Sequence, residues 1–468
     1  MQRRRFLARS AQAAVGVALA PEVTRAGGFE IVAKPAVMTP KVGTGPARLN
    51  VRDAGFAAAG DGVTRDTAAL QAALDRCGVL GGGEVLVPEG TYLTGSIQLR
   101  SNTVLRLAEG AVLMGSPDMA DYAVTEVRWE GRWIPGHIGL IYAIDAQGVG
   151  VMGPGKIVGN EAVGGRPAKD QPLRHPALLE FLRCDSVHLQ GFSTSYFRMW
   201  SIHPTASKNL LIEDLTIRST GGNGDGIDVD SCRHVVIRRC DIATGDDCIS
   251  LKSGRGEEGY MQAMPTEDVT ISDCTFADSI FACIGIGSET SGGIRNVTIE
   301  RCKFTAAKTF AIYIKSRPGR GAFLENITAE DLDVLGMTGG FLRFNLLNSG
   351  LLGEDPVPGV DGIPAGRNFV FRNVRVKDVP VLVEGAGVHP AKPLDGLVLE
   401  NISGTCAKGI VLANARRVVV RNVSVTGFAG PLLSIANVTG IGLHGAAVVD
   451  APMLPDMVPE RAEPYKLQ

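Results

Sequence analysis

A short phrase returns along most of this chain and constrains the fold more than any other feature. Each copy opens on a turn residue and then alternates apolar and polar residues, as in Asn296-Val-Thr-Ile-Glu-Arg-Cys302. Alternation with a period of two is typical of a half-buried strand, and repeats of this length indicate a solenoid. The copies are mostly 21 to 34 residues apart and begin at Asp185, Asn209, His234, Asp268, Asn296, Asn326, Asn368, Gly396 and Arg417.

The composition of the repeats favours a β-solenoid over a helical one. They lack the Leu-x-x-Leu-x-Leu frame of leucine-rich repeats and the 3.6-residue period of helical repeats. The 59 glycines and the frequent Val, Ile, Asn and Thr favour short strands joined by tight turns. We therefore predict an all-β fold, a parallel β-helix in which each coil contributes about three short strands. Asn at the repeated turn position can take left-handed backbone geometry and can stack as a ladder.

The two ends of the chain differ from the repeats. Residues 66–77 form an amphipathic pattern that predicts a helix, capped by Thr64 or Asp66 and ended by Gly78. We expect this helix to cover the open N-terminal end of the solenoid, because terminal coils need capping. The sequence suggests a linker over residues 21–47, a single β-helix domain over 48–450 and a C-terminal tail over 451–468.

Residues 1–20 have the features of an export signal. Met1-Gln-Arg-Arg-Arg-Phe-Leu resembles a twin-arginine signal, and Ala18-Leu-Ala20 has the form of a cleavage site. This predicts a periplasmic or extracellular protein, and the alternative is an ordinary basic start. No apolar run reaches about 18 residues, so no membrane span is expected. The net charge of −2 gives no sign of nucleic-acid binding.

The nine cysteines form no CxxC pair, so a zinc ribbon is not indicated. Cys240, Cys274 and Cys302 take the same place in successive repeats. We interpret them as small core residues that stack in a ladder rather than as ligands. We expect no metal and no cofactor.

Two acidic motifs carry the predicted chemistry. Asn223-Gly-Asp225 and Gly245-Asp246-Asp247 are separated by one copy of the repeat, with Asp225 and Asp246 21 residues apart. One coil of a β-helix would place them on adjacent strands about 4.8 Å apart. Three crowded carboxylates cannot all ionise easily, so one can stay protonated and act as an acid on a glycosidic bond. Asp228, three residues beyond Asp225, is expected on the opposite strand face if the strand is regular.

Further segments accompany these motifs in order. They are Asn50-Val-Arg-Asp-Ala-Gly-Phe, Gly60-Asp-Gly-Val-Thr-Arg-Asp-Thr, Val87-Pro-Glu-Gly-Thr-Tyr-Leu-Thr-Gly-Ser, Leu113-Met-Gly-Ser-Pro-Asp, Trp200-Ser-Ile-His-Pro and Ile286-Gly-Ser-Glu-Thr-Ser-Gly-Gly. Over roughly residues 48–335 the chain resembles bacterial members of glycoside hydrolase family 28, the polygalacturonases. The resemblance implies a right-handed parallel β-helix that hydrolyses pectic poly- or oligosaccharides with inversion. It also implies that Asp246 is the general acid, that Asp225 and Asp247 hold and deprotonate the attacking water, and that Asn223 lies at the substrate.

Two motifs depart from the family pattern. No histidine lies between His234 and His389, so the Gly-His-Gly motif expected near Phe281 is missing its histidine. Where Arg-Ile-Lys is expected the chain has Tyr313-Ile-Lys315, which removes a bidentate guanidinium. We expect Lys315 to bind a substrate carboxylate, and Phe281 and Tyr313 to offer an aromatic surface to a sugar. A rhamnogalacturonan-type substrate is the alternative within the family.

Other residues and other functions remain open. Trp200, 25 residues before Asp225, is either a sugar platform or a packed core aromatic, and His203 is interpreted as structural. Lys252 and Arg317 follow their strands and are expected at the surface. The rival functions are a polysaccharide lyase, which often uses Ca²⁺, and a non-catalytic glycan-binding β-helix protein. We expect a monomer.

Overall fold

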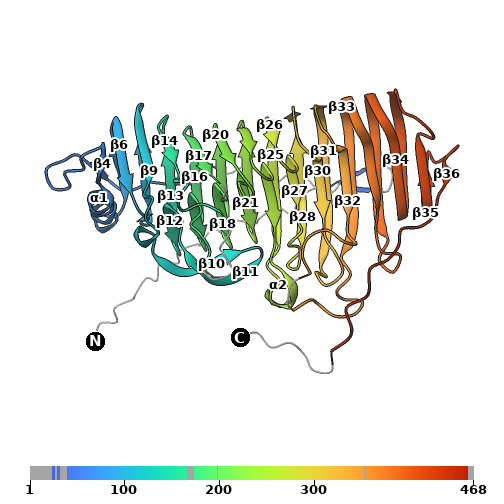
Figure 1. The fold of residues 1–468 in the computed structure, drawn as a ribbon, viewed down its shortest axis with the longest axis horizontal. Coiled ribbons are helices and arrows are strands. Elements are labelled where there is room, and N and C mark those ends of the chain that lie inside the picture. The colour runs from blue at the N-terminus through green and yellow to red at the C-terminus, as the bar shows by residue number, and fades with distance from the viewer. Residues whose placement is uncertain are drawn as a thin grey trace, which may run out of the picture.

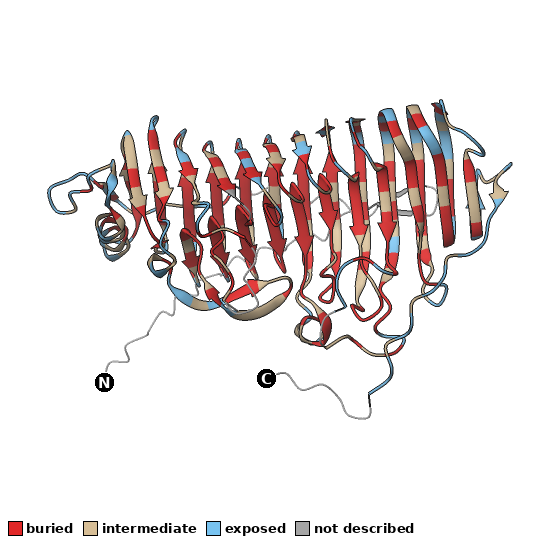
Figure 2. Ribbon diagram, viewed as in Figure 1, coloured by how far each residue is buried: buried red, intermediate tan, exposed pale blue. Residues whose placement is uncertain are grey.

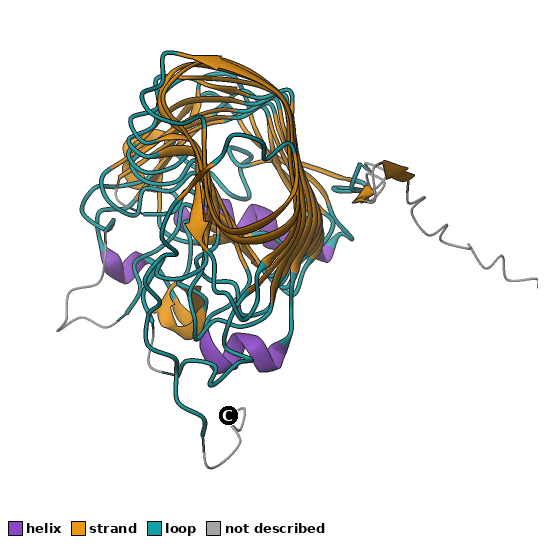
Figure 3. Cartoon of the chain, turned by 90° about the vertical axis from the view of Figure 1, so that its right-hand side faces the viewer, coloured by secondary structure: helices purple, strands orange, loops and turns teal. Residues whose placement is uncertain are grey.

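The chain folds into a parallel β-helix, as predicted (Figure 1). The computed structural model describes residues 39–165, 173–197, 199–352 and 355–461, together with two short strands, β1 (Thr24–Ala26) and β2 (Phe29–Ile31). The coils stack along one long axis, and the end-on view shows their strands lying over one another around a common interior (Figure 3).

Each coil contributes strands to three parallel ladders, named here the first, second and third sheets. The first sheet contains β3 (Ala47–Asn50), β5 (Gly83–Val87), β8 (Thr103–Leu107), β13 (Gln147–Met152), β16 (Asp185–Gln190), β19 (Lys208–Glu213), β22 (Arg233–Arg238), β25 (Thr266–Ser272) and β28 (Ile294–Glu300). The second contains β4 (Asp61–Arg65), β6 (Gly90–Thr94), β9 (Ala111–Gly115), β14 (Lys156–Val158), β17 (Ser193–Phe197), β20 (Thr216–Thr220), β23 (Asp241–Thr244), β26 (Thr275–Ser279) and β29 (Lys303–Phe304).

The third sheet carries the acidic motifs at its N-terminal edge. It contains β7 (Ile97–Gln98), β12 (Ile141–Ile144), β15 (Leu179–Leu182), β18 (Ile202–Thr205), β21 (Ile227–Asp230), β24 (Ile249–Lys252), β27 (Ile284–Ile286), β30 (Phe310–Lys315) and β32 (Gly340–Asn345). In the last coils the strands run on through the turns, as β31 (Phe323–Leu335), β33 (Ala365–Gly387), β34 (Leu394–Thr426) and β35 (Leu433–Ile441), before β36 (Ala447–Val448).

The repeated phrase forms the strands of the first sheet, and its apolar positions face the core. Val235, Val269 and Val297 stand opposite one another in register on β22, β25 and β28, and all three are buried. Two residues further along each strand, Ile237, Ile271 and Ile299 form a second buried row in register. Figure 2 shows burial running along the strands of the central coils, with exposed residues gathered at turns and in the C-terminal segment.

The residue that opens each copy makes the turn possible, as predicted. Asn296 and Asn326 have φ of 57° and 56°, the left-handed region that Asn tolerates better than most residues. Their side chains also stack, because Asn296 Nδ2 donates to Asp268 Oδ1 at 2.9 Å and Asn326 Nδ2 donates to Asn296 Oδ1 at 3.0 Å. Asn368 continues this ladder with a bond of 3.1 Å to Asn326.

The predicted cysteine ladder is present. Cys240, Cys274 and Cys302 are buried and follow one another on three coils, with the thiol of Cys274 in contact with the other two. All nine cysteines are buried free thiols.

Helix α1 (Thr67–Val79) closes the N-terminal end of the solenoid and packs on β3, β5, β7 and β8 (Figure 1). Asp66 takes the predicted N-cap position, but the predicted side-chain cap and the predicted C-terminal end are wrong. Gly78 lies within the helix, which ends one residue later. Asp66 precedes the helix, but its carboxylate accepts bonds from the N–H groups of Ala59 (2.6 Å) and Gly60 (2.9 Å) rather than capping it.

Further elements lie outside the coils. A short 3₁₀ turn, η1 (Met119–Asp121), leads into an antiparallel hairpin of β10 (Val124–Trp129) and β11 (Arg132–His137). Helix α2 (Gly256–Gln262) follows β24. From β36 to residue 461, where the described part of the chain ends, there is no regular structure, and this segment runs back along the solenoid, where Arg461 pairs with Glu257 of α2 at 3.0 Å (Figure 1).

The predicted export signal, residues 1–20, lies outside the described residues. Among the helices that the structure describes, none is long and apolar enough to cross a lipid bilayer.

Candidate active site

The three predicted acids come together at the turns that lead into the third sheet. Asp225 precedes β21, and Asp246 and Asp247 precede β24, the strand of the next coil. The two strands pair in register, with Ile227 opposite Ile249. One carboxylate oxygen from each aspartate lies within 4.8 Å of the others. The single repeat between the motifs therefore spans one coil, as the spacing predicted.

Asp247 is the best-bonded member of the cluster. Its Oδ2 accepts a bond from Lys315 Nζ at 2.7 Å and one from the Ser250 hydroxyl at 3.4 Å. Its Oδ1 accepts from the Ala282 N–H at 3.2 Å. These three donors hold the Asp247 carboxylate in one orientation. Burial opposes the charge of Lys315, but Asp247 and Asp246 outweigh it and raise the pKa of the lysine.

Asp246 has no cation within bonding distance among the described residues. It accepts backbone bonds from the N–H of Asp247 at 3.0 Å and of Asn223 at 3.4 Å. Burial and the negative charge of Asp247 raise the pKa of Asp246. It is the only half-buried member of the cluster, since Asp225 and Asp247 are 4% and 3% exposed. Asp246 can therefore both keep a proton and touch a ligand.

Asp225 is buried, and its Oδ1 has no hydrogen-bond partner. Burial, together with the charges of Asp228 and Asp246, raises the pKa of Asp225 well above its usual value. A buried oxygen without a donor is costly in the free protein, so a water molecule or ligand hydroxyl is the natural partner for it.

The expectation that Asp228 points away from the cluster is wrong. Gly226 still belongs to the turn, so strand alternation starts only at Ile227, and Asp228 faces outward beside the other acids. It is fully buried, and its Oδ1 lies 2.5 Å from Lys252 Nζ. Burial and the charges of Asp247 and Asp246 outweigh the opposing effect of Lys252 and raise the pKa of Asp228 to about 7.

The expected surface position of Lys252 is also wrong. Its side chain is 8% exposed, and its ammonium lies 4.1 Å from the centre of the Trp200 ring. The charge is retained because Asp228 and Asp225 outweigh the effect of burial and raise the pKa of Lys252. Arg317, also expected at the surface, is partly exposed and donates to the Gly350 carbonyl at 2.7 Å.

Trp200 cannot serve as a sugar platform in this structure, because it is only 1% exposed. Trp129, from the hairpin β10–β11, stacks on its ring with centroids 4.8 Å apart, and Lys252 and His203 also contact it. Trp200 is a packed aromatic that contacts the lysine paired with Asp228. His203, as expected, is buried, and its Nδ1 lies 3.3 Å from Glu180 Oε1.

Phe281 and Tyr313 form the aromatic pair that the sequence placed here. Their ring centroids are 5.9 Å apart, and Lys315 Nζ lies 4.7 Å from the centre of the Phe281 ring. Phe281 is half-buried, while Tyr313 is 6% exposed and shares a hydrogen bond of 2.7 Å with the Ser349 hydroxyl. Phe281 is the member with more surface to offer a sugar ring.

Two charged residues near the cluster were missed by the sequence reasoning. Glu289, in the Gly-Ser-Glu segment, is buried, and Lys252, Arg320 and Lys315 outweigh its burial and lower its pKa. Arg343 on β32 has its guanidinium 5.0 Å from the centre of the Tyr313 ring. The Gly-Ser-Glu segment could have drawn attention to Glu289, whereas no motif marks Arg343.

The cluster fits an acid/base site better than a cation site. Each of the three aspartates offers an oxygen that could bind a metal ion, and Ca²⁺ takes about six to eight such ligands. Lys315 already occupies Asp247 Oδ2 and supplies positive charge at that position.

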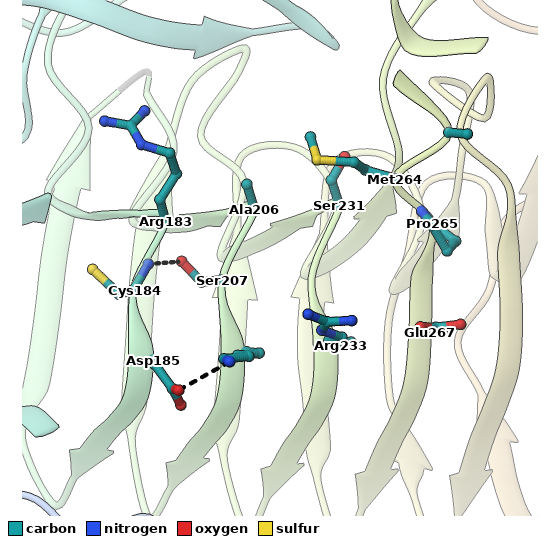
Figure 4. A pocket seen from close by; sticks show the side chains of 12 residues that line it. Arg183, Cys184, Asp185, Ala206, Ser207, Ser231, Arg233, Met264, Pro265 and Glu267 are labelled. Atoms are coloured by element: carbon teal, nitrogen blue, oxygen red, sulfur yellow. Dashed lines mark hydrogen bonds and ion pairs between the residues drawn. The ribbon is translucent and has the colours of Figure 1, made fainter. Parts of the chain in front are cut away.

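A separate cavity of about 440 Å³ lies at the turns after the third-sheet strands, the opposite edge from the acids (Figure 4). Several of its ionic groups are engaged with neighbours, since Arg183 pairs with Asp145 at 2.7 Å and Lys208 with Asp185 at 3.1 Å. It contains none of the predicted site residues.

The sequence profile of glycosyl hydrolases family 28 matches residues 77–341, which include the three aspartates and Lys315. The chain belongs to glycosyl hydrolases family 28. It is therefore a glycoside hydrolase.

Relatives of this family 28 enzyme agree with that assignment. A probable polygalacturonase of Vitis vinifera is 30% identical over 74% of this chain and 72% of its own length. The exopolygalacturonase of Thermotoga maritima is 27% identical, with a TM-score of 0.68 over 84% of this chain and 94% of that one. A family 28 exopolygalacturonase of Yersinia enterocolitica, at 20% identity, has the same fold, with a TM-score of 0.71 over 88% of this chain and 79% of that one.

Proposed function

We propose that this family 28 enzyme hydrolyses O-glycosidic bonds in pectic chains that contain uronic acid, and that Asp225, Asp246 and Asp247 perform the chemistry. The observation that carries the proposal is the unequal environment of three carboxylates in one cluster. Asp247 is bonded to an ammonium, whereas Asp246 and Asp225 have raised pKa values and no such bond. Carboxyl groups whose pKa values are pushed apart can divide into an acid and a base.

The geometry favours a division of roles. Asp246 keeps its proton and reaches solvent, so it is the group that protonates the leaving oxygen. Asp247, bonded to the Lys315 ammonium, accepts a proton from the attacking water. Asp225 Oδ1, buried without a donor, orients that water. Asn223 fixes the turn on which Asp225 lies and donates its N–H to Asp246.

The substrate class follows from the charges and from the relatives. Lys315 lies beside the cluster, and its ammonium can contact a uronate carboxylate as well as Asp247. The relatives named above are polygalacturonases. The aromatic pair Phe281 and Tyr313 supports a second candidate, a rhamnogalacturonan-type chain, because rings suit the methyl group of a deoxy sugar.

Inversion of configuration is proposed from the family resemblance and not from the carboxylate spacing. The nearest oxygens lie within 4.8 Å of one another. Inverting glycosidases typically separate their two carboxyl groups by about 6.5–9.5 Å to admit a water. The stereochemistry therefore needs a direct measurement of the product.

We also propose export to the periplasm or beyond, supported by the arginine-rich start and the Ala18-Leu-Ala20 segment. Fractionation of cells that produce the full chain, with and without Arg3→Lys and Arg4→Lys, tests this. The variant pair should leave the protein in the cytoplasm. Export that is unchanged in the variant would refute a twin-arginine signal.

A substrate panel tests the enzymatic proposal. Purified protein is incubated with homogalacturonan, rhamnogalacturonan and uronate oligosaccharides, with and without chelator, and reducing ends and ultraviolet absorbance are recorded. Hydrolysis predicts new reducing ends without new absorbance, unaffected by chelator, and abolished in Asp246→Asn. New absorbance would indicate a lyase. Glycan binding without turnover in the wild type would indicate the non-catalytic alternative.

A further inference from the structure

Arg343 lies three coils beyond the strand that follows Asp247 and one coil beyond Tyr313. The third sheet places Ser250, Gly285, Tyr313, Arg343 and Glu384 opposite one another in register on successive coils. The Arg343 guanidinium carbon lies 5.0 Å from the centre of the Tyr313 ring and 5.8 Å from that of Phe310. Two aromatic rings thus hold this cation on the same outward row as the acid cluster.

The guanidinium is incompletely bonded. Its Nη2 lies 3.1 Å from Glu384 Oε1, and its Nε is buried without a hydrogen-bond partner. The side chain is 31% exposed. Arginine carries five N–H donors in a fork that matches a carboxylate. Glu384 engages only Nη2 of this partly exposed side chain, which leaves further donors for an incoming carboxylate oxygen.

A second cation flanks the same aromatic ring. Lys315 Nζ lies 5.7 Å from the centre of the Tyr313 ring and 4.7 Å from that of Phe281. The outward row therefore presents an ammonium next to the acids and a guanidinium one coil further along. Cations on successive coils suit a polysaccharide that carries an anionic group on successive sugar units. Adjacent coils are about 4.8 Å apart.

We propose that Arg343 forms a distal subsite that binds the carboxylate of a uronic acid unit removed from the bond that is cleaved. The inference rests on the proposed function, because it assigns part of that same substrate. The chain has Tyr313 where a guanidinium is expected, and Arg343 supplies one from the following coil. Glu384 engages only one end of the fork, and its negative charge limits the affinity of the subsite.

The test separates binding from turnover. In the Asp246→Asn background, calorimetry measures the binding of hexagalacturonate and of its fully methyl-esterified form. Arg343→Gln should weaken hexagalacturonate binding about 10- to 100-fold, the effect of losing hydrogen bonds to a charged group. Binding of the ester should change less than about 3-fold. Glu384→Gln should tighten hexagalacturonate binding, because it removes a competing negative charge.

The control is Arg375→Gln, which removes an exposed arginine paired with Asp333 at 2.6 Å on the second-sheet side of β33. It should leave both affinities unchanged. If Arg343→Gln weakens the binding of both ligands equally, or of neither, the subsite is overturned. The proposed function would remain intact. If Asp246→Asn protein with Arg343 intact binds no hexagalacturonate and the wild type hydrolyses none, both proposals fail.

Discussion

Lys315 and Asp247 meet across a glycine. The ammonium of Lys315 on β30 reaches Asp247 Oδ2 at 2.7 Å, and Gly285 on β27 lies beneath the contact. A Cβ at Gly285 would lie 2.3 Å from Asp247 Oδ2 and 3.0 Å from Lys315 Nζ. The missing side chain therefore leaves the space in which the lysine holds the aspartate.

Gly285→Ala should lower kcat while leaving the fold intact. The new methyl group displaces the Asp247 carboxylate, and a misplacement of this size can cost about 100-fold in rate. The unfolding temperature should change little, because the nearest atoms are side-chain ends rather than backbone. Gly55→Ala is the control, since nothing lies within 4 Å of its Cβ position. Full activity in Gly285→Ala would show that this contact does not position Asp247.

The assignment of Asp246 as the acid predicts a pH dependence. Burial and Asp247 raise the pKa of Asp246, so it keeps its proton above the usual range for an aspartate. The rate should therefore fall as the pH rises through that raised value, because the acid loses its proton. The pH profile of kcat/KM on oligogalacturonate measures this alkaline limb.

A substrate with a good leaving group checks the same assignment. A 4-nitrophenyl galacturonide needs little protonation of its leaving oxygen, so the alkaline limb should disappear and Asp246→Asn should keep much of its activity. Asp247→Asn should remain inactive on both substrates, because the water still needs a base. If Asp246→Asn loses both activities equally, Asp246 is not the acid.

Glu180→Gln should destabilise the protein by about 3–5 kcal/mol, because it leaves Arg174 as an unpaired buried charge. Arg174 Nη2 lies 2.6 Å from Glu180 Oε2, and both side chains are fully buried. Denaturant unfolding measures the loss. The control Glu84→Gln breaks the more exposed pair with Arg106 and should cost less than about 1 kcal/mol. Equal effects would contradict this account.

The Arg174–Glu180 pair also predicts how stability depends on pH. Burial alone would raise the pKa of Glu180, but Arg174 and His203 outweigh it and lower the pKa to about 2. A carboxyl group with a lowered pKa contributes stability that is present above its ordinary value of 4.5 and is lost as the pH falls towards about 2. Glu180→Gln should therefore lose less stability than the wild type between those two pH values.

The asparagine ladder predicts a difference between two substitutions. Asn326 has φ of 56° and bonds both Asn296 and Asn368. Asn326→Gly and Asn326→Ala lose the same bonds, but only alanine is strained in left-handed backbone, by about 1–2 kcal/mol. Alanine should be the more destabilising by that amount in urea unfolding. Equal stability of the two variants would contradict a role for the turn geometry.

The repeat predicted the coils, the ladder of turn asparagines and the proximity of Asp225 to Asp246. Each of these depends only on the number of residues between successive copies of the repeat. Asp228 was misplaced because the turn before β21 shifts the alternation by one position. The sequence could not decide between the two interpretations of Trp200, since its burial depends on Trp129 folding back from a hairpin outside the coils. Arg343 was missed because its relation to Tyr313 is a register between strands rather than a motif.

The most direct test of the central claim is proton NMR of homogalacturonan digested by the wild type and by Asp246→Asn. We predict that the wild type releases new reducing ends whose first-formed anomer is β, opposite to the α-linkage that is cleaved, and that Asp246→Asn releases none. First-formed α-anomer would contradict the inverting mechanism. Undiminished release by Asp246→Asn would contradict the role of the acid cluster itself.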